Sequence, residues 1–278
     1  MRFILAFLIL IAPVSTYAED RFITLASTTS TQNSGLYDYL LPIFTAKTGI
    51  GVRVISVGTG QAIRIAQNGD ADVLLVHHRP SEDAFLAQGY GIERRDVMYN
   101  DFVIIGPKDD PAKLAGITRA SDGLKAIYDA QTLFISRGDE SGTHKRERAL
   151  WADTGIVPTG DWYREIGAGM GAALNMAASV EAYTLSDRGT WLSFGNKGDL
   201  ALLLSGDDAL FNPYGIILVN PAKYPHVKID MARTFSDWMV SAEGQTAIGA
   251  FTLKKVQLFC PNANPKLNLK TICPTSVP

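Results

Sequence analysis

The stretch RFITLASTTSTQNSGLYDYLLPIFTAKTGIGVRVISV, residues 21–57, has the pattern of a strand, a helix and a second strand. Its two ends, 21–27 and 51–57, are short apolar runs bounded by polar residues or glycine, which is typical of strands. The middle segment, 35–49, carries apolar residues that fall on one face of a helix: Leu36, Leu40, Ile43 and Phe44. A strand, a helix and a strand in this order predict a βαβ unit, and therefore a mainly parallel sheet.

The same alternation continues along the chain. Strand-like runs follow at 71–77 and 97–106, and the segment GPKDDPAKLAG, 106–116, marks a break. A second set of elements comes after it, with strands expected at 132–136, 182–186 and 200–205 and helices at 143–155 and 171–182. A late strand at 214–221 and a long helix at 231–251 complete the pattern.

This organisation predicts two α/β lobes, because about 260 residues exceed the commonest size of one domain. Lobe 1 is expected to contain 19–105 and 216–278, and lobe 2 to contain 106–215. Extended segments near 103–107 and 215–221 would cross between the lobes. Two crossings of this kind suit a hinged clamp.

The N-terminal residues 1–18 have the form of a secretory signal peptide. Arg2 supplies a positive charge, an apolar core follows from Phe3 to Ile11, and small residues lead to Ala18. The alternative is a membrane anchor, but the apolar run is roughly half of the 20 or so residues that a spanning helix needs. We predict cleavage after Ala18 and a periplasmic protein.

The mature chain is expected to be soluble and close to neutral. Without Arg2 it has 25 basic and 28 acidic residues, a formal charge of −3. A nucleic-acid-binding surface would need a marked basic excess, so we predict no nucleic-acid partner.

The two cysteines, Cys260 and Cys273, are expected to form a disulfide, because an exported chain meets an oxidising compartment. Closing a loop of about 14 residues would contribute about 3 kcal/mol in the chain-entropy model. Two cysteines without a nearby histidine fall short of the four ligands of a structural zinc site.

The segment SRGDESGTHK, 136–145, joins an expected strand to an expected helix that begins near Gly142 or Thr143. The free N–H groups of a first helical turn and the positive end of the helix dipole favour an anion. Ser141 and Thr143 add hydroxyl donors, and Arg137 adds a charged fork suited to an oxyanion. The alternative is a loop in which Ser141 caps the helix and Arg137 lies in solvent.

Two further strand-to-helix turns have the same composition. Thr28, Thr29 and Ser30 belong to a run of five hydroxyl residues, more than one helix cap requires, and Thr59 stands between two glycines. Each turn alone could be a polar turn with one capping residue. Neither matches a dinucleotide fingerprint or a P-loop. Together the three turns favour the capture of an oxyanion.

The sequence gives less support to an enzyme than to an oxyanion-binding protein. GDESG misses the spacing of the G-x-S-x-G nucleophile elbow. His77 and His78 are adjacent in a strand, so their side chains point to opposite faces. His144 has no cysteine or aspartate placed by sequence to complete a triad, and His226 lies in a proline-flanked segment. We predict no catalytic residue, no metal cation and no cofactor.

Several motifs resemble one family, the substrate-binding components of tungstate ABC importers of the TupA type. The resemblance covers nearly the whole mature chain and rests on STTSTQNSGLYDYLLPIF, VGTGQAIRIAQNGDADVLLVH, GYGIERRDVMYNDFVIIGP, SRGDESGTHKRERALW, GAGMGAALNMA, YTLSDRGTWL and FNPYGIILVNP. It implies an α/β, two-lobed periplasmic binding protein fold of type II, the molybdate/phosphate-binding class, with a dehydrated tetrahedral oxyanion in a cleft between the lobes.

The family's motifs fall on the residues already singled out. The resemblance implies that the oxyanion is bound by Thr28, Thr29, Ser30, Thr59, Arg137, Ser141, Gly142 and Thr143. Ser27 stands where the usual motif begins with threonine, so a hydroxyl is kept. The SDRGT segment also matches, and it stays open whether Arg188 reaches the ligand or only pairs with Asp187.

The identity of the anion is argued in part from the residues. Monohydrogen phosphate is best recognised by an acceptor carboxylate, and the segment LLVHHRP, 74–80, has no aspartate where related phosphate-binding proteins have one. The choice of tungstate over molybdate rests on the resemblance. The resemblance also implies a membrane permease as partner. We expect a monomer. The alternatives are molybdate, sulfate or phosphate as the principal ligand, an exported hydrolase, and a ligand sensor or scaffold.

Overall fold

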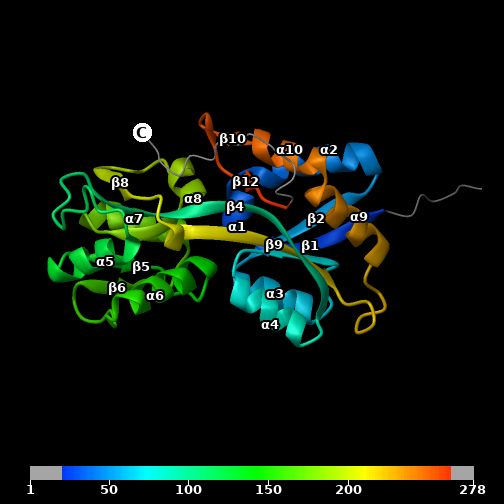
Figure 1. The fold of residues 1–278 in the computed structure, drawn as a ribbon, viewed down its shortest axis with the longest axis horizontal. Helices are drawn as coiled ribbons and strands as arrows, with labels where there is room; N and C mark the ends of the chain where they lie inside the picture. Colours follow the sequence, from blue (N-terminus) through cyan, green and yellow to red (C-terminus); the bar gives the residue numbers. More distant parts are fainter. Residues whose placement is uncertain (1–20, 264–278) are drawn as a thin grey trace, which may run out of the picture.

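A computed structural model describes residues 21–263 (Figure 1). The predicted signal peptide with its cleavage after Ala18, and Cys273 of the predicted disulfide, lie outside these residues and stay predictions. The chain forms two α/β lobes, which confirms the predicted fold class. None of the helices within residues 21–263 is long and apolar enough to cross a bilayer.

The sheet of lobe 1 has the strand order β12-β4-β9-β3-β1-β2. Its strands are β1 (Phe22–Thr28), β2 (Gly51–Val57), β3 (Val73–Val76), β4 (Gly91–Pro107), β9 (Phe211–Val219) and β12 (Cys260–Pro261). Only β1, β2 and β3 run parallel to one another. The predicted mainly parallel sheet is therefore wrong: β9 comes back from lobe 2 and enters antiparallel to β3, and β4 pairs antiparallel with β9.

Lobe 2 is built on the second half of β4. The strands β7 (Thr184–Asp187) and β8 (Leu200–Leu204) both pair antiparallel with it. The short strands β5 (Phe134–Ser136) and β6 (Tyr163–Glu165) pair parallel, and one bridge from Phe134 to Tyr183 joins them to β7.

Helices cover both faces of each lobe (Figure 1). In lobe 1 one face is covered by α2 (Leu36–Thr48), α9 (Ile229–Val240) and α10 (Ala242–Ala250), and the other by α3 (Thr59–Gln67) and α4 (Arg79–Ala87). In lobe 2 the pairs are α5 (Ala120–Asp129) with α6 (Gly142–Thr154), and α7 (Met170–Val180) with α8 (Arg188–Ser193). Short elements complete the fold: α1 (Thr29–Asn33), η1 (Asp208–Leu210), β10 (Thr252–Leu253) and β11 (Val256–Gln257).

The single helix expected at 231–251 is two helices. Ser241 has extended backbone angles, and its hydroxyl accepts a hydrogen bond from the Gly244 N–H at 3.2 Å, which caps α10. A Cβ at Gly244 would lie 2.1 Å from the carbonyl oxygen of Trp238, so glycine is required for this tight junction. Continuous apolar periodicity hid the break, because both helices pack on the same core.

The lobes are joined by two neighbouring strands. β4 pairs with β9 as far as Asp101 and changes partner at Phe102, which pairs with β7. At this crossing Asn100 lies opposite Asn212, and Asp101 lies opposite Phe211. The crossing lies at 100–102 in β4 and 211–212 in β9, a few residues before the expected segments 103–107 and 215–221. Both strands stay extended through it. The exact limits of the lobes stay predictions.

Candidate functional site

A cleft of about 570 Å³ is lined by residues of both lobes. All eight residues expected to bind an oxyanion line it: Thr28, Thr29, Ser30, Thr59, Arg137, Ser141, Gly142 and Thr143. The first four lie at or just after the ends of β1 and β2 in lobe 1, and the others lie in the loop after β5 and the first turn of α6 in lobe 2. Segments far apart in the sequence therefore meet at one place, at the carboxyl ends of strands where α/β proteins bind ligands.

Three helices of eight or more residues begin at the cleft within the described part of the chain. These are α3 after Gly58, α6 after Ser141 and α7 after Gly169. The first amide groups of a helix have no acceptor inside it, and the helix dipole makes this end positive. The cleft therefore offers neutral donors in a positive field, which suits an oxyanion.

The N-terminus of α7 was not among the predicted binding residues. Gly169, Met170, Gly171 and Ala172 all line the cleft. The motif GAGMG at 167–171 was noted only as part of the family resemblance. Its glycines before a helical pattern could have suggested an exposed helix N-terminus, but the segment carries no polar side chain to draw attention to it.

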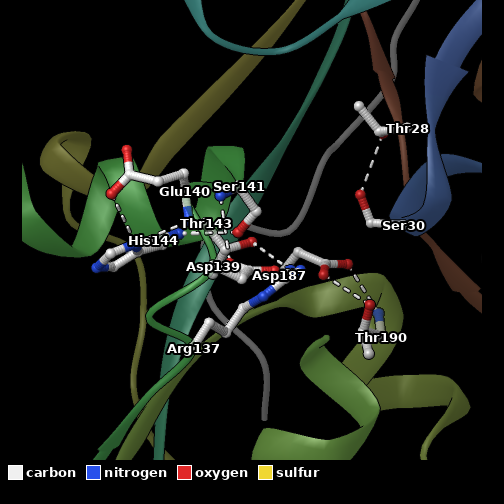
Figure 2. A network of polar contacts seen from close by, with 10 residues as sticks. All are labelled: Thr28, Ser30, Arg137, Asp139, Glu140, Ser141, Thr143, His144, Asp187 and Thr190. Carbon is white, nitrogen blue, oxygen red and sulfur yellow. Dashed lines mark hydrogen bonds and ion pairs between the residues drawn. The ribbon is translucent and has the colours of Figure 1, made fainter. Parts of the chain in front are cut away.

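The hydroxyl run of lobe 1 is internally hydrogen-bonded. The Thr28 hydroxyl lies 3.2 Å from that of Ser30 (Figure 2). It also lies 2.7 Å from the Thr31 hydroxyl. Ser27 has a different role, because its hydroxyl donates to the Leu75 carbonyl at 2.7 Å and bonds the Tyr37 hydroxyl. The serine that departs from the usual threonine thus ties β1 to β3 beneath the cleft and does not line it.

Arg137 is held in the cleft wall, with its side chain 12% exposed. Its Nη2 donates to Asp139 Oδ2 at 2.5 Å, and its Nη1 lies 3.5 Å from the Thr143 hydroxyl (Figure 2). Its Nε is buried and has no hydrogen-bond partner among residues 21–263. The alternative of a solvated Arg137 is wrong, although Ser141 does cap α6, since it accepts from the His144 N–H at 3.2 Å.

Asp139 is a cleft residue that the sequence analysis missed. Burial raises the pKa of its carboxyl, but hydrogen bonding to Ser141 and the charge of Arg137 outweigh burial, so the pKa lies below its ordinary value. One oxygen accepts from Arg137 and the other from the Ser141 N–H at 3.2 Å. The carboxylate is therefore ionised at neutral pH, and both of its oxygens are already engaged.

Arg188 is not among the residues that line the cleft. Its guanidinium is 3% exposed and forms a two-pronged ion pair with Asp101, in which Nε lies 2.6 Å from Oδ1. Asp187 instead caps α8, accepting from the Thr190 N–H at 2.8 Å and from its hydroxyl at 2.6 Å (Figure 2). The expected pairing with Asp187 is wrong, because Arg188 pairs with Asp101 and fastens α8 to β4 beside the crossing.

Two histidines near the cleft differ in environment. His144 is 2% exposed, and its Nδ1 accepts from the Glu140 N–H at 3.1 Å, which stabilises the loop before α6. His77 lines the cleft itself and faces lobe 2 closely: a Cβ added to Gly142 would lie 2.9 Å from His77 Cε1 and 3.1 Å from the Thr59 hydroxyl oxygen. The two lobes thus touch at Gly142.

Comparisons with known proteins agree with this geometry. Residues 13–243 match the model of a PBP superfamily domain. The chain is 50% identical over 247 residues to the tungstate-binding protein TupA of Peptoclostridium acidaminophilum, covering 87% of this chain and 86% of that protein.

Two solved structures are similar throughout. One is the tungstate-binding protein TupA of Desulfovibrio alaskensis G20, with 45% identity and a TM-score of 0.79, covering 87% of this chain and 99% of that one. The other is described as the tungstate ABC transporter from Geobacter sulfurreducens, with 50% identity and a TM-score of 0.77, covering 83% and 98%.

Proposed function

Because the chain belongs to the TupA family within the PBP superfamily, we propose that it captures tungstate outside the cytoplasm and delivers it to an ABC importer. It is a substrate-binding component of transport and not an enzyme. One observation carries the proposal: residues of both lobes that can donate hydrogen bonds line a single cleft, with the N-termini of α3, α6 and α7 at its wall.

The tungstate oxyanion would be held by four residues from each lobe. Lobe 1 supplies Thr28, Thr29, Ser30 and Thr59, and lobe 2 supplies Arg137, Ser141, Gly142 and Thr143. Backbone N–H groups and hydroxyls can replace the water shell of the anion, and the Arg137 fork adds a charged donor. Ligand contacts from both lobes favour the closed clamp, since only closure brings the two sets of donors together.

The donor set favours a fully ionised tetrahedral anion over monohydrogen phosphate. A phosphate proton is best received by a free carboxylate, and Asp139, the carboxylate that lines the cleft within the described residues, already accepts from Arg137 and Ser141. Tungstate is chosen over molybdate because the relatives are named for tungstate. We further propose a periplasmic monomer, released by cleavage after Ala18, with the membrane permease of the importer as partner.

Tungstate is expected to stabilise the protein against heat. A ligand bound only by the folded state adds about 4 kcal/mol to the free energy of unfolding at a thousandfold excess over Kd. Anion-stripped protein should be melted with tungstate, molybdate, sulfate and phosphate, and each anion also titrated by calorimetry. We expect the largest rise of Tm with tungstate. A melt raised by phosphate or by a sugar, but unchanged by tungstate, would refute the proposed function.

Gly142→Ala is expected to weaken tungstate binding about tenfold or more. The added methyl group would meet His77 and Thr59 across the cleft, so the lobes would have to separate or the His77 ring would have to move. Overpacking of this kind typically costs about 1–3 kcal/mol. Gly51→Ala is the control, because it lies outside the cleft and its added Cβ would make only an ordinary contact, 3.5 Å from Phe22 Cβ. Calorimetry that finds equal losses in both variants would contradict this contact.

A further inference from the structure

His77 lines the cleft but has no part in the proposed set of donors. It follows β3 directly and is 7% exposed. Its ring stacks on Tyr214, with centroids 4.8 Å apart and planes inclined by 30°. The ring is therefore fixed in place, and its orientation is set by lobe 1.

The hydrogen bonds of His77 define which nitrogen carries the proton. The Asn212 side-chain N–H donates to Asn100 Oδ1 at 2.6 Å, so the Asn212 oxygen is left to accept from His77 Nδ1 at 2.9 Å. A neutral histidine with its proton on Nδ1 has a lone pair on Nε2. Within residues 21–263, Nε2 has no hydrogen-bond partner, so no described residue competes for this lone pair on a residue that lines the cleft.

The charges around this ring come from several elements. Arg137 and Asp187 act on it from lobe 2, the ionised Asp139 lines the same cleft, and His78 is its chain neighbour. His77 also lines a second cavity of about 270 Å³, whose other charged residues are Arg79, Lys145, Arg146 and Asp208. Burial lowers the pKa of His77, the Asn212 bond and Asp187 oppose this, and Arg137 adds to the lowering. The His77 ring is thus neutral at pH 7 in the absence of a bound anion.

We propose that His77 takes up one proton on Nε2 when the oxyanion binds in the cleft, which makes it a second cationic residue of the site beside Arg137. The inference rests on the proposed function. The proton comes from solvent and the charge of the anion is unchanged. A dianion near a buried imidazole favours its charged form, and the unpaired Nε2 is the atom that can accept the proton.

The pH dependence follows from linkage. Bound anion raises the pKa of His77 above its value in the free protein, so the complex holds more protons than its components. Affinity should then increase as pH falls through the pKa of the complex, by up to about tenfold per pH unit, and level off below the pKa of the free protein. Above the pKa of the complex the affinity should not depend on this residue.

Proton uptake can be measured directly. Micromolar tungstate is titrated into the full protein by calorimetry at pH 8 and pH 6, in buffers that differ in their enthalpy of ionisation. The slope of the observed heat against that enthalpy gives the protons taken up. We expect a slope near zero at pH 8 and a clear fraction of one proton at pH 6. His77→Gln should bind tungstate with no uptake at pH 6.

His78→Gln is the matched control, because the pKa of His78 is lowered to about 4 by burial and by neighbouring cations, outside the range tested. It should keep the uptake of the native protein. Equal uptake in His77→Gln and the native protein, or none at pH 6 in the native protein, would overturn the inference. If His77→Gln does not fold, an NMR titration of the His77 Cε1 proton in the native protein, with and without tungstate, tests the inference. A His77 pKa that does not rise with tungstate overturns the inference. No tungstate binding even at pH 8 would refute the proposed function, and the inference with it.

Discussion

Arg137→Ala is expected to weaken tungstate binding by about 2–5 kcal/mol, since loss of a buried charged partner typically costs this much. Arg137 is the cationic side chain that lines the cleft within the described residues, and its Nε has no protein partner there. The loss has two sources, because the variant also leaves the Asp139 carboxylate without its ion pair beside a dianion. Calorimetry with tungstate measures the sum.

A second variant separates the two sources. Arg137→Ala with Asp139→Asn removes both charges, so the part of the loss due to repulsion should be recovered. Arg137→Lys should recover only part of the affinity, because an ammonium group cannot reproduce the planar fork. Thr143→Ala removes a neutral donor and should cost about 1–3 kcal/mol. Native affinity in folded Arg137→Ala would mean that the anion is bound elsewhere.

Glu147→Gln is expected to stabilise lobe 2 at pH 8. Glu147 lies on α6, is 1% exposed, and accepts a hydrogen bond from the Tyr163 hydroxyl at 2.7 Å. Burial raises its pKa from 4.5 to about 7, although Tyr163 opposes the rise. A raised carboxyl pKa means that the folded chain holds the proton more tightly than the unfolded chain. Stability is then full below about pH 4.5 and falls as pH rises to about 7.

The amide cannot ionise and can still accept from Tyr163, so it should abolish this fall. A difference of about 2.5 pKa units corresponds to about 3 kcal/mol in the free energy of unfolding at pH 8, and to almost nothing at pH 4.5. Urea unfolding followed by tryptophan fluorescence measures it, since Trp151 and Trp162 lie in the lobe 2 core. Glu181→Gln, at an exposed side chain of lobe 2 that follows α7, is the control. A gain of equal size at both pH values would contradict the role of ionisation.

The fold could be predicted where the pattern is local. The strand, helix and strand of 21–57 occur as β1, α2 and β2, because apolar spacing decides both the element and its buried face. The direction of β4 and β9 could not be predicted in this way. Their pairing depends on where the chain returns after building lobe 2, and no residue within either strand encodes that route.

The candidate site could likewise be predicted where the pattern is local, and not where residues meet through the fold. Hydroxyl groups, glycines and one arginine before expected helices pointed to the three turns, since helix N-termini have a recognisable composition. The family resemblance supplied the eight residues expected to bind, and all eight line the cleft. Asp139 and His77 were missed for different reasons. Asp139 reads as an ordinary loop residue in the sequence, because its ion pair with Arg137 depends on how the loop folds. His77 enters the cleft only because β3 ends beside lobe 2.

The paired crossing of β4 and β9 has a consequence for the thermodynamics of capture. Two separate flexible linkers would let the lobes rotate about several axes, and closing on a ligand would then remove much orientational entropy. Here the hydrogen-bonded ribbon at Asn100 and Asn212 leaves mainly bending and twisting, and the ion pair between Arg188 and Asp101 stiffens it further. We therefore expect the open state to be a narrow ensemble. Little entropy should then be lost on closure, so that most of the free energy of the anion's contacts is retained as affinity.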